Sequence, residues 1–150
     1  MSLTALQAFA TAHGLTVKSA AGAHEFLLEG KAPGRTVVMS QGSIVHPRSG
    51  GKFFHYRLSF EPYVREPGFM LTPQGGTRWD RSGPVPCAPG ELPGHARFAA
   101  PLAAFGEEVK THWQLKLGEQ QHLYLEALEL VSPRAWELAW EVVSAAWEAR

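Results

Sequence analysis

Apolar residues recur with a helical spacing near the two ends of the chain. At the N-terminal end, one helical face would carry Leu3, Leu6, Phe9 and Ala10. At the C-terminal end, the same spacing places on one face Trp136, Trp140, Val143 and Trp147. Ser132 and Pro133 precede that second run, and they favour the cap and the first position of a helix. The pattern predicts one amphipathic helix at each end, and the tryptophan face needs a large apolar surface to pack against.

Between residues 15 and 71 the apolar residues alternate with polar ones, which is typical of strands with one buried face. The clearest run is 52–61, whose apolar face carries Phe54, Tyr56, Leu58 and Phe60. Shorter runs predict strands at 15–17, 25–28, 35–39, 44–46 and 68–71, with a turn at 40–43. These runs predict an antiparallel meander of four or five strands.

Two further alternating runs, 113–117 and 122–130, flank a polar segment and predict a hairpin. A helix stays open as the alternative for 122–130, because Leu, Glu, Gln and Ala are good helix formers. A helix is also expected over 101–109. The pattern therefore predicts the α+β class: an N-terminal helix, an antiparallel sheet of about five to seven strands, and a C-terminal amphipathic helix packed on one sheet face.

Residues 73–101 differ from the rest of the chain in composition. They hold six of the eleven prolines and five of the fifteen glycines. Proline removes a backbone donor and fixes φ, so we expect an irregular loop over 73–101, inserted in a single domain that spans 1–150. Its Trp79, Leu92 and Phe98 would hold it against the surface.

Charge and composition narrow the classes of partner. The chain has 14 basic and 14 acidic residues, so no net charge draws it toward nucleic acid or anionic lipid. It begins without a basic segment and contains no run of eighteen apolar residues, which argues against a signal peptide and a membrane span. With one cysteine, Cys87, it forms no internal disulfide, and we expect a cytoplasmic protein.

The residues that commonly carry chemistry form no recognisable motif. The seven histidines are His13, His24, His46, His55, His95, His112 and His122. None has the spacing of a zinc motif, and no G-x-S-x-G nucleophile turn occurs. Cys87 and His95 lie eight residues apart, and Glu91 could orient the imidazole, but they are embedded among prolines and glycines with no helix N-terminus to activate the thiol. The sequence therefore assigns no catalytic residue, no cofactor and no metal ligand.

Two clusters are candidate contacts for a partner. Residues 52–57 interleave basic and aromatic side chains, as single-strand binders do, but the alternation leaves only Phe53, His55 and Arg57 outside the core. With no net positive charge, nucleic acid is disfavoured as the partner. The second cluster, Arg78, Trp79 and Arg81, has the composition of an interface hot spot.

The same second cluster has a structural alternative, in which Trp79 is buried and Asp80 pairs with a neighbouring arginine to pin the loop. We therefore expect a small interaction or accessory domain that binds a protein partner or itself. The alternative is a small-molecule-binding or hydrolytic enzyme, with His and Glu side chains in a cleft beneath residues 73–101.

Overall fold

The structure, a computed structural model, describes residues 3–22, 24–61, 68–80, 82–117 and 122–149. Three α-helices lie in the described part of the chain: α1 (Leu3–Ala12), α2 (His95–Val109) and α3 (Pro133–Glu148). A 3-10 turn, η1, spans Pro89–Glu91. The strands are β1 (Thr16–Ala20), β2 (Phe26–Ala32), β3 (Arg35–Val45), β4 (Lys52–Glu61), β5 (Phe69–Thr72), β6 (Gly75–Asp80), β7 (Gly83–Cys87), β8 (Trp113–Leu117) and β9 (Leu123–Leu128).

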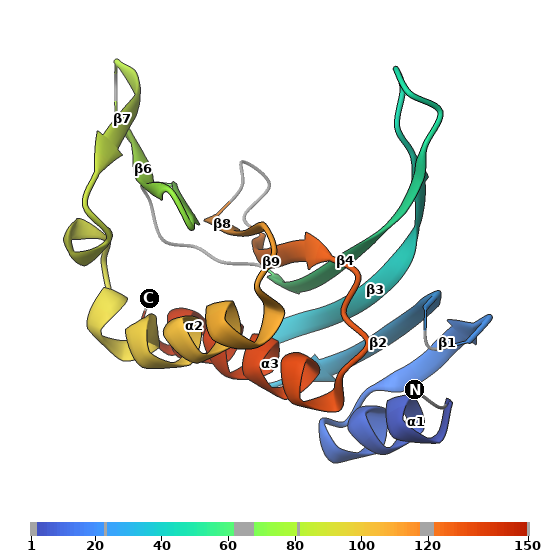
Figure 1. Ribbon diagram of the computed structural model, residues 1–150. Coiled ribbons are helices and arrows are strands. Elements are labelled where there is room, and N and C mark those ends of the chain that lie inside the picture. The colour runs from blue at the N-terminus through green and yellow to red at the C-terminus, as the bar shows by residue number, and fades with distance from the viewer. Residues whose placement is uncertain (1–2, 23, 62–67, 81, 118–121, 150) are drawn as a thin grey trace.

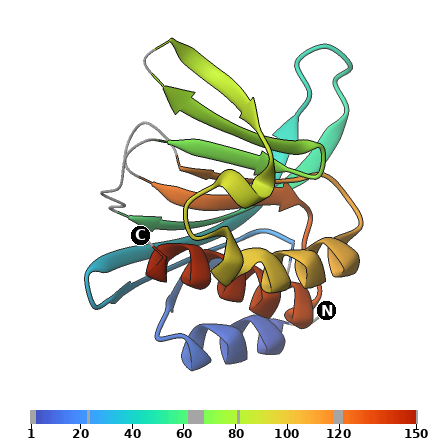
Figure 2. The same ribbon diagram turned by 90° about the vertical axis from the view of Figure 1, so that its left-hand side faces the viewer.

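The nine strands form one antiparallel sheet in the order β1-β2-β3-β4-β9-β8-β5-β6-β7. At its centre β4 pairs with β9, with Leu58 opposite Leu125, so strands far apart in the chain meet there. The helices all lie on one side of the sheet, and α2 and α3 run side by side (Figures 1 and 2). The α+β class predicted from the sequence is confirmed, although the sheet has more strands than the five to seven expected.

The tryptophan face of α3 packs into the core as its spacing predicts. Trp136 and Trp147 are buried, and Trp140 is half-buried. The ring of Phe60, on β4, lies 5.2 Å from that of Trp140 and 6.1 Å from that of Trp147. Burying each large side chain stabilises the fold by roughly 1.5–3 kcal/mol, so this layer contact is a main source of stability.

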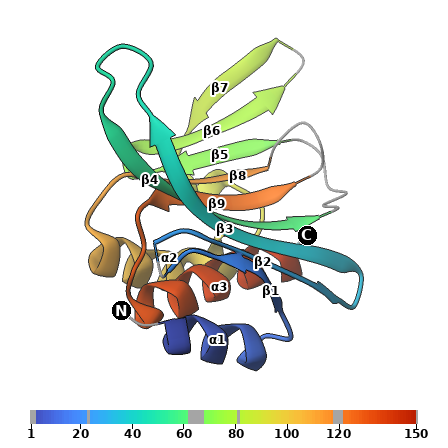
Figure 3. The same ribbon diagram turned by 90° about the vertical axis from the view of Figure 1, so that its right-hand side faces the viewer.

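Aromatic contacts hold α1 against α3 at the β1 side of the sheet (Figure 3). The Phe9 ring lies 5.9 Å from the Trp136 ring, and the His13 ring lies 4.2 Å from the Trp140 ring. His13 Nε2 also lies 2.9 Å from Oε2 of Glu137. The helix predicted at the N-terminus is therefore present and docked on the C-terminal one.

The prediction of an irregular loop over 73–101 is wrong for most of that segment, which forms β6, β7, η1 and the first half of α2. Pro84 and Pro86 lie in β7, the last strand of the sheet order. Because residues two apart in a strand point their N–H groups to the same side, both missing donors can face the unpaired edge. Pro-rich composition therefore did not exclude a strand.

Two boundaries also differ from the prediction. The helix expected over 101–109 begins at His95, and Pro101 lies inside it at the loss of one helical hydrogen bond. The turn expected at 40–43 is wrong, since β3 runs through it without a break. The hairpin of 113–130 is confirmed as β8 and β9, and its turn, 118–121, lies outside the described residues.

No helix within the described ranges has the length and apolar character that crossing a membrane would need.

Candidate partner-binding face

The sheet face opposite the helices carries the first cluster that the sequence singled out and, of the second, Trp79. On β4 the residues that alternate with the buried Tyr56, Leu58 and Phe60 are Phe53, His55, Arg57 and Ser59. The register places Arg57 opposite Glu126 of β9, and Lys116 of β8 opposite Tyr124 of β9. Trp79 of β6 joins this row, with the Lys116 Nζ atom 5.9 Å from its ring. The helix-free face thus presents alternating aromatic and cationic side chains over four strands.

The other two predicted residues of the second cluster do not join this face. Arg78 alternates with Trp79 along β6 and lies opposite Phe69 of β5, so it belongs to the other face. Arg81 lies outside the described residues. Asp80 accepts hydrogen bonds from the backbone and hydroxyl of Ser82, at 2.8 and 2.6 Å, and so closes the β6–β7 turn. Trp79 is half-buried, so it is neither fully exposed, as an interface hot spot would be, nor fully buried, as a side chain that pins the segment would be.

Arg57 is the centre of the charged part of the face. Its guanidinium carbon lies 3.9 Å from the centre of the Tyr124 ring, within the range of a cation–π contact. Its Nη1 atom lies 3.8 Å from Oε1 of Glu126, and His55 Nε2 lies 3.7 Å from Oε2 of the same carboxylate. One carboxylate therefore faces both a guanidinium and an imidazole. These partly exposed ion pairs fix side-chain positions more than they add stability.

The ends of β3 and β4 extend beyond the rest of the sheet as a two-stranded segment. The pairing of β2 with β3 ends at Gln41, and the pairing of β9 with β4 ends at His55. We call residues 42–54 the β3–β4 ribbon. Among the described residues no strand pairs with either outer edge of the ribbon. It rises away from the helical layer, as the β6–β7 hairpin does on the other side of the face (Figure 1).

Exposed aliphatic side chains gather at this ribbon. The structure describes four exposed large hydrophobic residues, and three of them are Ile44, Val45 and Leu128, at 42%, 62% and 43% exposure. Ile44 lies opposite Phe53, and Leu128 lies opposite His55, the next residue of β4 on the same face. Ile44, Phe53 and Leu128 therefore form one apolar patch on the helix-free face, which we call the ribbon patch. Val45 lies on the opposite side of the ribbon.

Ile44 and Leu128 are not predicted as contacts from the sequence, because short alternating runs favour strands with a buried face. A signal was nevertheless present. From residue 30 to residue 60 the chain contains no Asp or Glu, although five lysines and arginines occur there. In a chain with no net charge, a segment that has basic residues and no carboxylates indicates a surface with an excess of positive charge.

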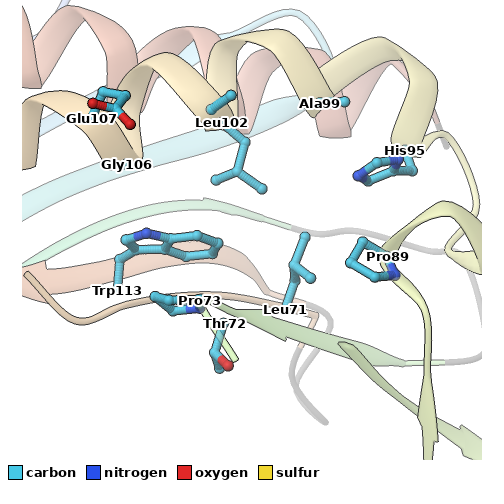
Figure 4. A pocket seen from close by; sticks show the side chains of 11 residues that line it. Leu71, Thr72, Pro73, Pro89, His95, Ala99, Leu102, Gly106, Glu107 and Trp113 are labelled. Atoms are coloured by element: carbon cyan, nitrogen blue, oxygen red, sulfur yellow. The ribbon is translucent and has the colours of Figure 1, made fainter. Parts of the chain in front are cut away.

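A second feature is a groove of about 410 Å³ between α2 and the strands β5 and β8 (Figure 4). Its walls are mostly apolar and include Leu71, Leu102 and Trp113. Figure 4 shows His95 near one end and Glu107 near the other. Twelve residues of helix separate them, which is about 18 Å of rise. The pairing of His and Glu that a hydrolytic site needs is therefore not formed by these two.

No group of three or more metal-ligating side chains comes together anywhere in the part of the chain that the structure describes. No family model, curated protein or solved structure matches the chain.

Proposed function

We propose that the protein is an interaction domain that binds another protein through its helix-free sheet face, with the β3–β4 ribbon as the main contact. The observation that carries this proposal is the gathering of exposed Ile44, Val45 and Leu128 on and beside a ribbon whose two outer edges pair with no other described strand. Exposed apolar residues on a free edge promote aggregation, so natural proteins usually cover or charge such edges. A partner that covers the ribbon patch removes that hazard.

The rest of the face supports this role. Aromatic residues and arginine are enriched at the centres of protein interfaces. On this face Arg57 and Tyr124 supply them on the neighbouring strands β4 and β9, and Trp79 supplies one further along the sheet, on β6. Because Arg57 already stacks on Tyr124, little side-chain entropy would be lost on binding.

A different protein fits the ribbon better than a second copy of the chain. Charged residues on a strand edge discourage pairing between identical edges. Lys52 belongs to the ribbon and Arg48 to its tip, so two ribbons laid together would bring like charges into contact. The proposed partner is therefore another chain.

Site-specific photo-crosslinking in the native host tests the proposal. A photoreactive phenylalanine analogue replaces Phe53, within the ribbon patch, in one variant and Glu141, exposed on α3, in a control. We expect one discrete protein adduct from position 53, none from position 141, and loss of the adduct when Ile44 and Leu128 are both changed to serine. An adduct that survives this double change contradicts the proposal, and so does an adduct from position 141 alone or from neither position.

A second candidate function rests on the groove beside α2. Its volume falls within the roughly 300–1,000 Å³ that is typical of small-molecule sites, and its walls suit an apolar ligand. The hydrophobic dye anilinonaphthalene sulfonate is a suitable probe. Ala103→Leu should fill the groove and abolish dye binding, whereas Ala100→Leu, exposed on the same helix but outside the lining, should not. Equal dye binding by both variants would rule out this candidate.

A further inference from the structure

We infer that the segment bound by the β3–β4 ribbon is acidic, with aliphatic side chains flanked by carboxylates on both sides. This inference rests on the proposed function and adds the chemistry of the partner. It follows from the charges around the ribbon patch and from how the carboxylates of the same region are already used.

The ribbon and the adjoining parts of β3 and β4 contain basic residues but no acidic ones. No Asp or Glu occurs between Glu29 and Glu61. Of the five basic residues in between, Arg35 stacks on Phe60 on the helix-covered face and takes no part in the ribbon. Lys31 lies near the far end of β2. The cations that remain on or next to the ribbon are Arg48, Lys52 and Arg57.

The glutamates at the end of β9 do not neutralise these cations fully. Glu126 is shared between Arg57 and His55. Glu129 accepts a hydrogen bond from His24, whose Nδ1 atom lies 2.7 Å from its Oε2 atom. No carboxylate in the described part of the chain pairs with Arg48 or Lys52 within ion-pair distance. These two charges are available to a partner.

His46 at the ribbon tip has a structural role. Its Nδ1 atom accepts hydrogen bonds from the backbone N–H groups of Arg48 and Ser49, both at 3.3 Å. These two bonds fix the imidazole ring against the backbone of the turn. The tip turn is thereby ordered, and Arg48 is presented on a defined backbone.

Cations flank the apolar residues along the ribbon. Arg57 lies on the same face as Phe53 and four residues further along β4, which is about 13 Å along a strand. Arg48 lies beyond Phe53 at the tip, and Lys52, the residue before Phe53, lies opposite Val45 on the other side of the ribbon. A complementary segment therefore places aliphatic residues over Ile44, Phe53 and Leu128 and carboxylates toward both ends. Such charge complementarity favours specificity and fast association.

Nucleic acid fits this surface less well. The patch is largely aliphatic, through Ile44 and Leu128, whereas single-strand binders use aromatic rings on which bases stack. The chain also has no net charge to offset a phosphate backbone.

Selection from a library of random peptides displayed on phage tests the inference, with the full chain as bait. We expect the selected peptides to be enriched in Asp and Glu beside aliphatic residues, relative to the unselected library. A synthetic copy of a selected peptide should bind the Arg48→Glu, Lys52→Glu double variant roughly tenfold more weakly, and its affinity should fall with added salt. The matched control is Lys18→Glu with Arg97→Glu, the same change in charge at exposed positions of β1 and α2, which should leave binding unchanged.

The other outcomes separate this inference from the proposed function. Selected peptides without acidic enrichment, whose binding is lost in the Ile44→Ser, Leu128→Ser variant, would overturn the acidic partner and leave the ribbon as the contact. Peptides whose binding none of these variants affects would overturn both. A short duplex DNA that binds as tightly as the peptides, and is released by Arg48→Glu with Lys52→Glu, would replace the acidic segment with nucleic acid.

Discussion

Gln41 and Leu130, distant in the chain, are joined by a buried hydrogen bond in which the Leu130 N–H donates to Oε1 of Gln41 at 2.8 Å. The Gln41 Nε2 group donates to the carbonyl of His24 at 3.2 Å, and Nε1 of Trp136 donates to the carbonyl of Leu130 at 2.9 Å. Gln41 is 2% exposed. One buried amide therefore connects β3, the turn before β2 and the segment that leads from β9 into α3.

Replacing Gln41 with methionine should lower the free energy of unfolding by about 2 kcal/mol. Methionine has a similar volume, so the main loss is that of the hydrogen bonds, which leaves the Leu130 N–H buried without its acceptor. For a chain of this length each kcal/mol corresponds to roughly 2–4 °C in Tm. Thermal unfolding followed by circular dichroism measures the effect, with Gln7→Met on the exposed side of α1 as the control. Equal Tm values for the two variants would show that the amide is dispensable.

Gly94 is a second position where one side-chain atom should matter. It precedes α2 with φ of +74°, a left-handed conformation that L-residues with a side chain adopt at a loss of roughly 1–2 kcal/mol. A Cβ atom at this position would also overlap the Cβ of Ala149, at the end of α3. Figure 1 shows the C-terminal end of the chain beside the start of α2.

Gly94→Ala should therefore destabilise the protein by at least about 2 kcal/mol, through backbone strain and through separation of the two helix ends. Gly90→Ala is the matched control, because a Cβ there meets no atom within 4 Å and the backbone is not left-handed. Urea denaturation of both variants measures the difference. A Gly94→Ala variant as stable as Gly90→Ala would mean that the ends of α2 and α3 can move apart without a loss of stability.

The helices at both ends and the strands with clear alternation could be predicted from the sequence, because each buries one periodic face. Ser132 does cap α3, with its hydroxyl accepting from the Ala135 N–H. The alternation of 52–61 correctly separated Tyr56 and Leu58 in the core from Arg57 on the other face. In these elements local preference and tertiary burial agree, and sequence patterns are reliable under that condition.

The prediction of a loop over 73–101 was wrong for the opposite reason, because there the local preference does not determine the structure. Its prolines and glycines suit an edge strand and its turns as well as they suit a loop, and only the position in the sheet distinguishes these structures. The same holds for the candidate site. Phe53, His55, Arg57 and Trp79 could be selected by residue type, but their placement on one face depends on β9 and β8 lying between β4 and β5. Ile44 was not selected, because its exposure depends on the pairing of β2 with β3 stopping at Gln41, which the sequence pattern does not reveal.

Asp80, the one aspartate of the chain, should titrate below its ordinary pKa of 3.8. The hydroxyl of Ser82, the backbone N–H of Ser82 and the nearby Arg78 all favour the ionised carboxylate and so lower the pKa of Asp80. A carboxylate with a lowered folded pKa stabilises its turn at pH values above the ordinary pKa, and the contribution is lost as pH falls through the folded value. The β6–β7 turn should therefore loosen only in acid.

Carboxyl carbon NMR measures this titration without ambiguity, because the chain has no other aspartate. Ser82→Ala removes the hydroxyl donor and should raise the pKa of Asp80 toward its ordinary value, whereas Ser49→Ala in the ribbon tip should leave it unchanged. An Asp80 that titrates at its ordinary pKa in the unmodified chain would contradict the turn geometry.

Tyr56→Phe should stabilise the protein, although it removes a polar group from the core. Tyr56 is fully buried, and its hydroxyl has no hydrogen-bond partner among the described residues. Burying a hydroxyl without a partner destabilises a fold, so its removal should raise the free energy of unfolding by about 1 kcal/mol. Tyr124→Phe, on the helix-free face, keeps the ring under Arg57 and serves as the control.

The pH dependence of this gain separates it from a general improvement in packing. Burial raises the pKa of Tyr56, so the folded state keeps the phenol neutral where the unfolded chain ionises, above about pH 10. The contribution of the neutral phenol is complete below that pH and is lost as pH rises toward the folded pKa. The stability difference between Tyr56→Phe and the unmodified chain should therefore widen above about pH 10. A Tyr56→Phe variant less stable than the unmodified chain at neutral pH would instead mean that the hydroxyl has a partner in solution, such as a buried water.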